Sequence, residues 1–345
     1  MDHLKKPMDY KAAGVDIAAG EAAVKAIKDK VRSTYNKNVL GDLGSFGGLY
    51  QIDQAAWKQP ILVSSTDGVG TKLRVAIMAG EYGTIGQDLV NHCVNDILVQ
   101  GALPQFFLDY IGVGILEPHK IEKIIDGLVK ACLENGCALI GGEMAEMPGI
   151  YQAEDFDLAG TIVGMVEKEQ LLPRNSIQAT DMLVALPSSG LHTNGYSLVR
   201  KIIFEMNKLS LDAYIEECQA TLGELLLSVH RSYLPALRSW LASPALHGLA
   251  HITGGGIAGN LKRILPSGIG AWINLTDDRI PALFHWLQSA GKIQDSVMRQ
   301  AFNLGVGMIA VVEESSAVDF AAKTNGWILG SLEAAAITVP QVRFL

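Results

Sequence analysis

The fold class is indicated most directly by one run, Ser64-Ser65-Thr66-Asp67-Gly68-Val69-Gly70-Thr71-Lys72. Its first two residues end the apolar segment Ile61–Ser65, which predicts a buried strand. The run supplies a carboxylate that can hold Mg²⁺, glycines whose backbone N–H groups can converge on a phosphate, and a lysine that can neutralise it. The alternative is a plain turn after a strand, although turns rarely need this combination of side chains.

Outward from this run, strand patterns alternate with helix patterns, as in α/β proteins. In the first half, helices are predicted at Gly20–Arg32, Thr84–Gln100 and Pro118–Asn135. Strands are predicted at Ile61–Ser65, Gln105–Leu116, Cys137–Ile140 and Leu158–Val166.

A polar stretch from Pro173 to Asp181 separates the two halves of the chain. Because the 345 residues exceed the about 250–300 that one hydrophobic core usually serves, we expect two domains, 1–172 and 173–345. In the second half, helices are predicted at Tyr196–Met206, Leu222–Leu241, Ile257–Leu265 and Pro281–Ser289. Strands are predicted at Met182–Leu186, Ala271–Asn274, Val306–Val312 and Trp327–Leu332.

Charge and hydropathy restrict the class of partner. The 36 acidic and 28 basic residues give a net charge of -8, and no Lys/Arg-rich run is present, so a nucleic-acid partner is not expected. Apolar runs are far shorter than the roughly 20 residues of a membrane span, and the polar start Met1–Lys11 lacks a signal peptide's apolar segment. We therefore predict a cytoplasmic protein without a membrane partner. The four cysteines form no CxxC pair and are predicted to be buried thiols.

The predicted helix Thr84–Gln100 has an unusual polar face, made of Asp88, Asn91, His92, Asn95 and Asp96. A solvated face is the simplest interpretation. Solvated helix faces, however, usually carry long Lys, Glu and Arg side chains, whereas these are all short. The pattern favours a packed polar site in which Asp96 supplies a second carboxylate to Mg²⁺.

Two further segments add candidate ligands in the first half. The run Ala138–Glu143 predicts a buried strand that ends in two glycines and Glu143, and ligands of α/β sheets collect beyond the carboxyl ends of strands. Asp67, Asp96 and Glu143 would then form an all-oxygen magnesium site, unless Glu143 is only a helix-start carboxylate. The glycine-rich segment Gly41–Gly48 is either a lid over bound nucleotide or a loose loop.

In the second half, the segment Pro187–Tyr196 joins a strand to a helix and offers hydroxyls and an amide to an anion or sugar phosphate. Within it, His192 can transfer a proton, although an N-cap and surface loop would explain the same residues. His251 precedes three glycines at another helix start, which predicts a second anion site. A structural role for His251 is the alternative.

These motifs, taken in order, resemble the aminoimidazole ribonucleotide synthetases, also called phosphoribosylformylglycinamidine cyclo-ligases. The matching segments span nearly the whole chain and are Tyr10–Ile17, Gly41–Leu49, Ser65–Lys72, Asn95–Ile97, Phe107–Tyr110, Gly141–Gly149, Gly190–Leu198, His251–Gly256 and Phe302–Met308. Collinear agreement of this extent is far more specific than any single motif.

The resemblance implies an α/β fold of two domains. The N-terminal domain would bind ATP and Mg²⁺, and its mixed sheet would pair with a second copy in a homodimer to give a barrel-like core. The implied reaction converts formylglycinamidine ribonucleotide and ATP into aminoimidazole ribonucleotide, ADP and phosphate. The formyl oxygen is a poor leaving group, so it is phosphorylated, the amidine nitrogen attacks the same carbon, and phosphate departs.

The resemblance also implies roles for particular residues. Magnesium ligands would be Asp67, Asp96 and Glu143. Nucleotide contacts would come from Gly44, Ser45, Phe46, Gly47, Gly48, Thr66, Asp67, Gly68, Gly70, Thr71 and Lys72. The ribonucleotide substrate would contact Asp109, Ser188, Ser189, His192, Thr193 and Asn194. Catalytic groups would be His192, His251 and Lys72.

Three alternatives have distinct sequence marks. Selenophosphate synthetases need a reactive Cys or selenocysteine near the start, whereas the first cysteine here is Cys93. Thiamine-monophosphate kinases usually have paired aspartates in the early strand motif, where this chain has Thr66-Asp67-Gly68. A non-catalytic nucleotide-binding protein would lack turnover, and three carboxylates together with Lys72 argue against it.

Overall fold

The computed structural model describes residues 10–11, 13–336 and 339–345. Most of the polar start, on which the expectation of no signal peptide depended, lies outside the described residues. The first half forms one four-stranded mixed sheet in the order β1-β4-β2-β3. Its strands are β1 (Pro60–Gly68), β2 (Leu103–Val113), β3 (Ala138–Glu146) and β4 (Phe156–Glu167). Strand β4 is antiparallel to β1 and β2, whereas β2 and β3 are parallel.

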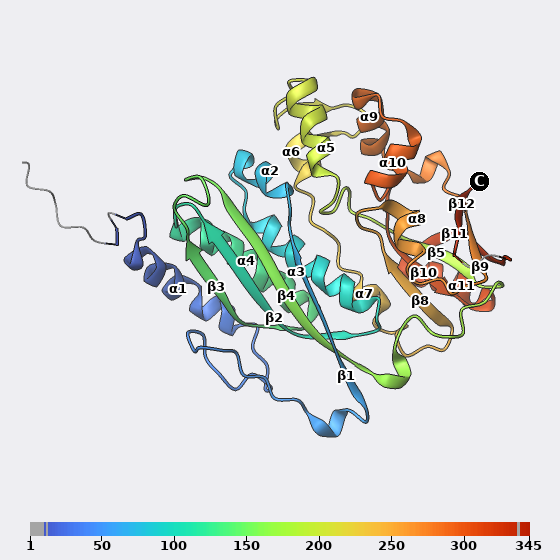
Figure 1. The fold of residues 1–345 in the computed structure, drawn as a ribbon, viewed down its shortest axis with the longest axis horizontal. Coiled ribbons are helices and arrows are strands. Elements are labelled where there is room, and N and C mark those ends of the chain that lie inside the picture. Colours follow the sequence, from blue (N-terminus) through green and yellow to red (C-terminus); the bar gives the residue numbers. More distant parts are fainter. Residues whose placement is uncertain (1–9, 12, 337–338) are drawn as a thin grey trace, which may run out of the picture.

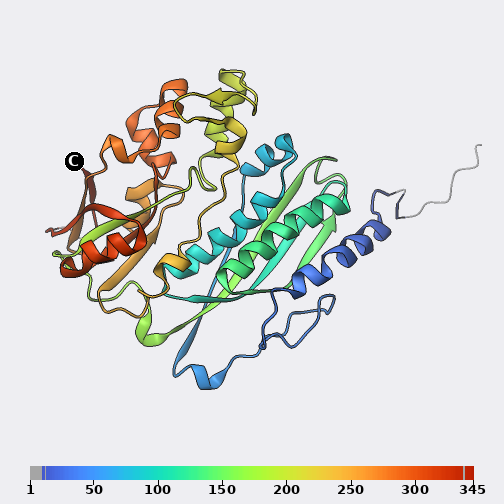
Figure 2. The same ribbon diagram turned by 180° about the vertical axis from the view of Figure 1, so that it is seen from behind.

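Helices cover one face of this sheet, and they lie in front of it in Figure 2. They are α1 (Ile17–Arg32), α3 (Gly83–Leu98) and α4 (Pro118–Asn135), and the short helix α2 (Lys72–Ala79) packs against α3 and α6 (Leu222–Leu226). Helices α3 and α4 pack closely because a Cβ atom on Gly86 would lie 2.3 Å from the Ile124 carbonyl oxygen. Only a glycine at this position lets the two backbones approach so far.

The opposite face of the sheet is not covered by a helix in Figure 1. Along β1, exposed residues alternate with partly buried ones, as in a strand with one solvated face, and no residue of β1 is fully buried, so the buried strand predicted at Ile61–Ser65 is instead a partly exposed edge strand. Leu62 on this face is 61% exposed. The first half of the chain therefore has one packed sheet face and one open face.

The second half forms a six-stranded sheet in the order β12-β9-β11-β5-β10-β8. The strands are β5 (Met182–Pro187), β8 (Leu246–His251), β9 (Ile269–Ile273), β10 (Val306–Val312), β11 (Trp327–Ala334) and β12 (Val342–Phe344), and β6 (Tyr214–Ile215) pairs with β7 (Ala220–Thr221) as a separate hairpin. The helices are α5 (Tyr196–Arg200), α6 (Leu222–Leu226), α7 (Leu234–Leu237), α8 (Gly256–Leu261), α9 (Ala282–Gly291), α10 (Asp295–Ala301) and α11 (Glu314–Thr324). No described helix has the length and apolar character that a membrane crossing requires.

The α/β fold class is confirmed, and the bounds of α4 and β10 are those predicted. The helix predicted at Leu222–Leu241 is wrong, because it breaks into α6, an irregular segment and α7. Pro235 lies at the start of α7, where its missing N–H costs nothing. The predicted helix Tyr196–Met206 is α5 followed by a π-helical turn, Lys201–Met206. Strand β8 and helices α10 and α11 were not predicted.

Candidate functional site

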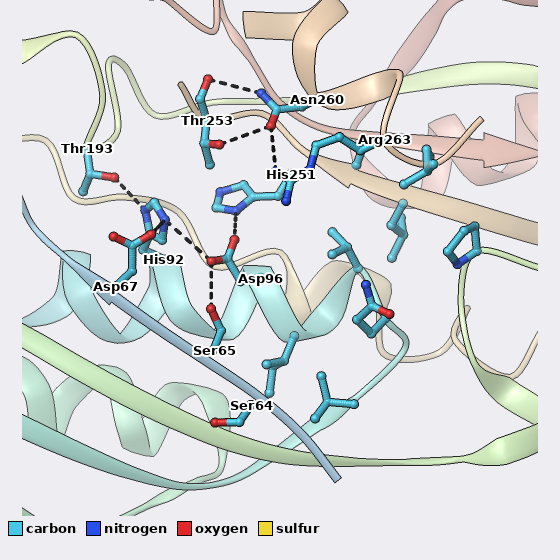
Figure 3. A pocket seen from close by; sticks show the side chains of 18 of the residues that line it. Ser64, Ser65, Asp67, His92, Asp96, Thr193, His251, Thr253, Asn260 and Arg263 are labelled. Carbon is cyan, nitrogen blue, oxygen red and sulfur yellow. Dashed lines mark hydrogen bonds and ion pairs between the residues drawn. The ribbon is translucent and has the colours of Figure 1, made fainter. Parts of the chain in front are cut away.

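A cavity of about 940 Å³ lies between the two halves of the chain, and we call it the central cavity. Strand β1 and helix α3 form one wall, and loops of the second half together with β8 and α8 form the other (Figure 3). Its polar lining residues are Ser64, Ser65, Asp67, His92, Asp96, Gln100, Thr193, Asn194, His251, Thr253, Asn260 and Arg263. Polar side chains from distant segments therefore meet at one place.

The carboxylates of Asp67 and Asp96 share one imidazole. His92 Nε2 lies 2.8 Å from Asp67 Oδ2 and 3.8 Å from Asp96 Oδ2. Burial alone would lower the pKa of His92, but the two carboxylates raise it above its usual value. The same contact outweighs burial at Asp67 and lowers the pKa of that carboxyl group. Asp67 and Asp96 are therefore ionised side by side, each with part of its surface open to the cavity.

A second histidine holds Asp96 from the other domain. His251 Nδ1 lies 2.8 Å from Asp96 Oδ1, and Ser65 Oγ donates to Asp96 Oδ2 at 3.1 Å. The pKa of His251 is lowered by burial despite this carboxylate, so the ring is neutral and donates from Nδ1. Its Nε2 atom then accepts, and His230 Nε2 lies 3.1 Å away.

The hydrogen bonds continue from His230 back to the first carboxylate. Thr193 Oγ1 lies 3.4 Å from His230 Nδ1 and 2.7 Å from His92 Nδ1. A continuous series of polar contacts therefore joins Asp67 to Asp96 through side chains of both halves. Because the three histidines of this series are buried, the positions of the two carboxylates are fixed before any ligand arrives.

A second cavity, of about 530 Å³, lies on the other side of the first domain, and we call it the loop cavity. It is lined by Gly44–Gly48, by aliphatic side chains of α1, and by Asp109 and Glu143. The ends of the Gly41–Gly48 loop are tied by a β-bridge between Val39 and Tyr50. Burial raises the pKa of Asp109 to about 7.

Comparison with known proteins agrees with this architecture. The family model of the AIR synthase related protein, N-terminal domain, matches residues 52–166, and that of the C-terminal domain matches residues 178–342. A phosphoribosylformylglycinamidine cyclo-ligase of Bacillus anthracis is 50% identical over 310 residues, which are 90% of each chain. One from Picosynechococcus is 49% identical over 334 residues, or 95% of this chain and 97% of that one. This chain belongs to the AIR synthase family.

Solved structures show that the family fold extends to other enzymes. Thiamine-monophosphate kinase from Stenotrophomonas maltophilia superposes with a TM-score of 0.66 at 19% identity, over 92% of this chain and 95% of that chain. The hydrogenase maturation protein HypE in complex with ATP gives a TM-score of 0.62 at 17% identity, over 93% and 90%. At these identities the likeness concerns the fold. The two family domains bracket the predicted boundary at residue 172, which stays a prediction.

In this member of the AIR synthase family, Lys72 does not line the central cavity. Its ammonium group is fully buried, 2.7 Å from Asp88 Oδ2, and it donates to the Ser228 carbonyl oxygen at 2.7 Å. The expectation that Lys72 neutralises a bound phosphate, or acts in catalysis, is therefore wrong for this structure. The reason is that Lys72 is the first residue of α2 and faces inward, toward α3.

The polar face of α3 is packed, as its short side chains indicated. Most of its residues, however, do not line the central cavity but bind backbone groups of the second half. Asp88 accepts from the His230 N–H, and Asn91 donates to the His230 carbonyl oxygen. Asn95 donates to the Arg231 carbonyl oxygen and accepts from the Tyr233 N–H. These bonds satisfy the backbone of the irregular segment between α6 and α7 and so hold His230 in place.

The three predicted magnesium carboxylates do not meet within one chain. Asp67 and Asp96 line the central cavity, whereas Glu143 lines the loop cavity with Gly44, Ser45, Phe46, Gly47 and Gly48. The reason is the strand order, since β1 and β3 lie at opposite edges of the sheet. The single three-carboxylate cluster is therefore corrected to a pair and a separate glutamate. Asp109 joins the loop cavity and not the predicted substrate residues of the second half.

The predicted substrate residues of the second half divide in the same way. Thr193 and Asn194 line the central cavity. Ser188, Ser189 and His192 do not. Ser188 Oγ donates to the Gly190 carbonyl oxygen, Ser189 Oγ donates to the Val229 carbonyl oxygen, and His192 Nε2 accepts from the Ser189 N–H. His192 is buried, and burial holds its pKa well below the usual value.

The residues of the run Ser64–Lys72, which begins within β1, also lie in different places. Gly68 and Gly70 line the central cavity. Thr66 lies on the open sheet face and is bonded to Thr161 at 2.7 Å, and Thr71 Oγ1 contacts Ser197 Oγ at 3.1 Å. Its one carboxylate, Asp67, is thus the part of this run that both lines the cavity and carries charge.

Among the described residues, two groups of side chains are close enough to be considered for a metal: one is His192, His230 and His251, and the other is His92, Asp96 and His251. The nitrogens of His192, His230 and His251 lie within 4.8 Å of one another. However, the His192 and His230 rings stack with centroids 4.0 Å apart and planes 18° apart, so their nitrogen lone pairs do not converge. Asp67 and Asp96 present carboxylate oxygens to a solvent-accessible cavity, which is the donor type that Mg²⁺ prefers.

The sequence reasoning missed His230, Asn260 and Arg263. His230 lay inside a segment predicted to be helical, and only Pro235, five residues later, indicated the break. Asn260 and Arg263 are three residues apart on and just after α8, which is the spacing of neighbours on one helix face.

Proposed function

We propose that this chain closes the imidazole ring of aminoimidazole ribonucleotide in purine biosynthesis, as an ATP-dependent ligase that forms a C–N bond. Its substrates are formylglycinamidine ribonucleotide and ATP, and its products are aminoimidazole ribonucleotide, ADP and phosphate. The family relationship at 50% identity over 90% of the chain supports the reaction. The single structural observation that carries it is the pair of ionised carboxylates, Asp67 and Asp96, in a cavity between two domains.

The residues of the central cavity match the demands of this chemistry. Asp67 and Asp96 would hold Mg²⁺, which neutralises phosphate charge while the terminal phosphoryl group of ATP is transferred to the formyl oxygen. Thr193 and Asn194 come from the second domain and would orient the ribonucleotide. His251 donates to Asp96 Oδ1 and Ser65 donates to Asp96 Oδ2, and these two bonds fix the orientation of the carboxylate in the cavity. Positioning of the reactants is then the main contribution of the protein.

We further propose that the loop cavity takes part in nucleotide binding across the homodimer proposed below, since within one chain it shares no lining residue with the central cavity. The Gly44–Gly48 backbone can approach phosphate oxygens closely, and the aliphatic side chains of α1 suit a flat apolar base. Glu143 supplies a carboxylate there. The charged, phosphorylated metabolites of this reaction do not cross membranes, so the enzyme would act in the cytoplasm.

A homodimer is part of the same proposal. The sheet of the first domain has one face without a covering helix, and Leu62 is exposed on it. Exposed apolar sheet faces of this kind are usually covered by a second layer. A second copy of the chain would supply that layer.

The test is release of ADP from ATP and Mg²⁺ when formylglycinamidine ribonucleotide is added. We expect release that depends on the ribonucleotide and gives one ADP for each aminoimidazole ribonucleotide formed. Thiamine monophosphate serves as the control substrate, because proteins of the same fold act on it. Nucleotide binding without substrate-dependent release would contradict the proposal and favour a nucleotide-sensing protein.

A further inference from the structure

The charges of the central cavity are unevenly distributed. Two carboxylates, Asp67 and Asp96, belong to the first domain. On the wall of the second domain, Arg263 is the only Lys or Arg among the described residues that line the cavity. In Figure 3 the guanidinium end of Arg263 turns back toward His251, beneath Asn260.

Arg263 has no carboxylate partner among the described residues. The one side-chain hydrogen bond of Arg263 within that part of the chain runs from Nη1 to Asn260 Oδ1, at 3.4 Å. An arginine has five N–H donors in a planar fork, so most of its donors stay available to a ligand. Since the side chain is exposed to the cavity, a bound anion could form two parallel hydrogen bonds with it.

Asn260 gives this arginine a fixed neighbour. Asn260 is buried, and its amide nitrogen donates to the carbonyl oxygens of Gly256 at 2.9 Å and of Thr253 and Gly254 at 3.3 Å. Its oxygen accepts from both Thr253 Oγ1 and Arg263. The asparagine therefore ties the glycine loop, a threonine hydroxyl and the guanidinium group into one unit.

The neighbouring wall adds a neutral polar group. A Cβ atom on Gly254 would lie 3.4 Å from Asn194 Oδ1, so the glycine loop passes directly beside Asn194. Asn194 and Thr253 both line the cavity. Helix α8 has only six residues, so the positive charge of this corner comes from Arg263 and not from a helix dipole.

We propose that Arg263 binds the 5′-phosphate of the ribonucleotide substrate. This inference rests on the proposed function and assigns the orientation of the substrate in the cavity. A phosphate monoester carries nearly two negative charges and would be repelled by the Asp67 and Asp96 carboxylates, so it binds at the Arg263 end. The basic amidine and the formyl group then lie at the carboxylate end, where ATP delivers its phosphoryl group.

The experiment compares Arg263→Gln with the wild type under steady-state conditions, varying each substrate in turn. Loss of a charge-assisted, bidentate contact should raise the KM for formylglycinamidine ribonucleotide by about tenfold to one-hundredfold. The KM for ATP should change less than about twofold, because Arg263 does not contact the nucleotide in this arrangement. Arg263→Lys should restore part of the loss, since lysine keeps the charge but not the fork.

A matched control and a second substrate separate phosphate binding from other effects. Lys262→Gln removes the same charge from the adjacent exposed residue, which does not line the cavity, and should leave both KM values unchanged. The formylglycinamidine ribonucleoside, which lacks the phosphate, should be turned over with nearly equal kcat/KM by the wild type and Arg263→Gln. The advantage of nucleotide over nucleoside should therefore shrink in the variant.

Several outcomes would overturn the inference. An equal loss of kcat/KM on nucleotide and nucleoside would show that Arg263 does not bind the phosphate. A rise in the KM for ATP alone would assign Arg263 to the triphosphate. If the wild type released no ADP with the ribonucleotide, the proposed function itself would fail; unchanged KM values in an active Arg263→Gln enzyme would reject only the phosphate site.

Discussion

The central cavity and the loop cavity both contain carboxylates, but they differ in how those groups are held. In the central cavity, Asp67 and Asp96 are bound by histidines and a serine that belong to both halves of the chain. In the loop cavity, Asp109 is desolvated without a charged partner, and Phe46 on the covering loop is fully exposed. The carboxylates of the central cavity are therefore held in place by hydrogen bonds within the chain, whereas the loop that covers the loop cavity still faces solvent.

The largest expected effect concerns the anchoring of the central cavity. Lys72→Met should lower the free energy of unfolding by about 3–5 kcal/mol, because it leaves the buried Asp88 carboxyl group without its ion-pair partner. Urea denaturation would measure the loss. If Lys72 instead served a bound phosphate, the variant would keep its stability and lose only affinity for ATP.

A double variant provides the control for this prediction. Lys72→Met combined with Asp88→Asn removes both charges but keeps a side-chain acceptor for the His230 N–H. It should recover most of the lost stability. No recovery would mean that the lysine contributes through packing and its bond to the Ser228 carbonyl oxygen.

The next effect concerns the buried carboxyl group of Asp109 in the loop cavity. Since burial raises the pKa of Asp109 to about 7, the folded protein binds a proton there that the unfolded chain releases near pH 4. The stability due to this proton is complete below about pH 4 and is lost as the pH rises to about 7. Asp109→Asn needs no proton at this position. The difference in the free energy of unfolding between Asp109→Asn and the wild type should therefore grow by about 3 kcal/mol, in favour of the variant, as the pH rises from 5 to 8. Urea denaturation at both pH values measures this, and a constant difference would contradict it.

The smallest of the three effects compares how much one carboxylate of each cavity contributes to turnover. Asp67→Asn should lower turnover more than about tenfold, a loss above about 1.4 kcal/mol of transition-state stabilisation, because Mg²⁺ is held less firmly. Glu143→Gln is the matched change in the loop cavity and should cost less. Near-normal turnover of Asp67→Asn would remove Asp67 from the metal site.

Much of the fold could be predicted from the sequence, because its main elements have strong local patterns. Helix α4 has a proline at its start, a glycine after its end and one apolar face, and its bounds were predicted without error. Strand β8 was missed because two histidines and a glycine interrupt its apolar residues. Burial of all six of its residues depends on partners distant in the sequence.

The candidate site was predicted in part for a similar reason. Spacing placed Asp67 at a strand end and Asp96 on a polar helix face, and both line the central cavity. Spacing does not reveal the lateral order of strands, so Glu143 was wrongly joined to them. Nor does it reveal which side of α2 faces inward, and Lys72 was misassigned for that reason.

Helix α3 has a consequence for how the molecule unfolds. One of its sides packs in a hydrophobic core that also includes Val184, Leu249 and Phe320 of the second half, and its polar side holds the backbone between α6 and α7. Neither half can detach without opening that shared interior. We therefore expect a single calorimetric transition and amide hydrogens in α3 that exchange only through global opening, although two family domains make up the chain.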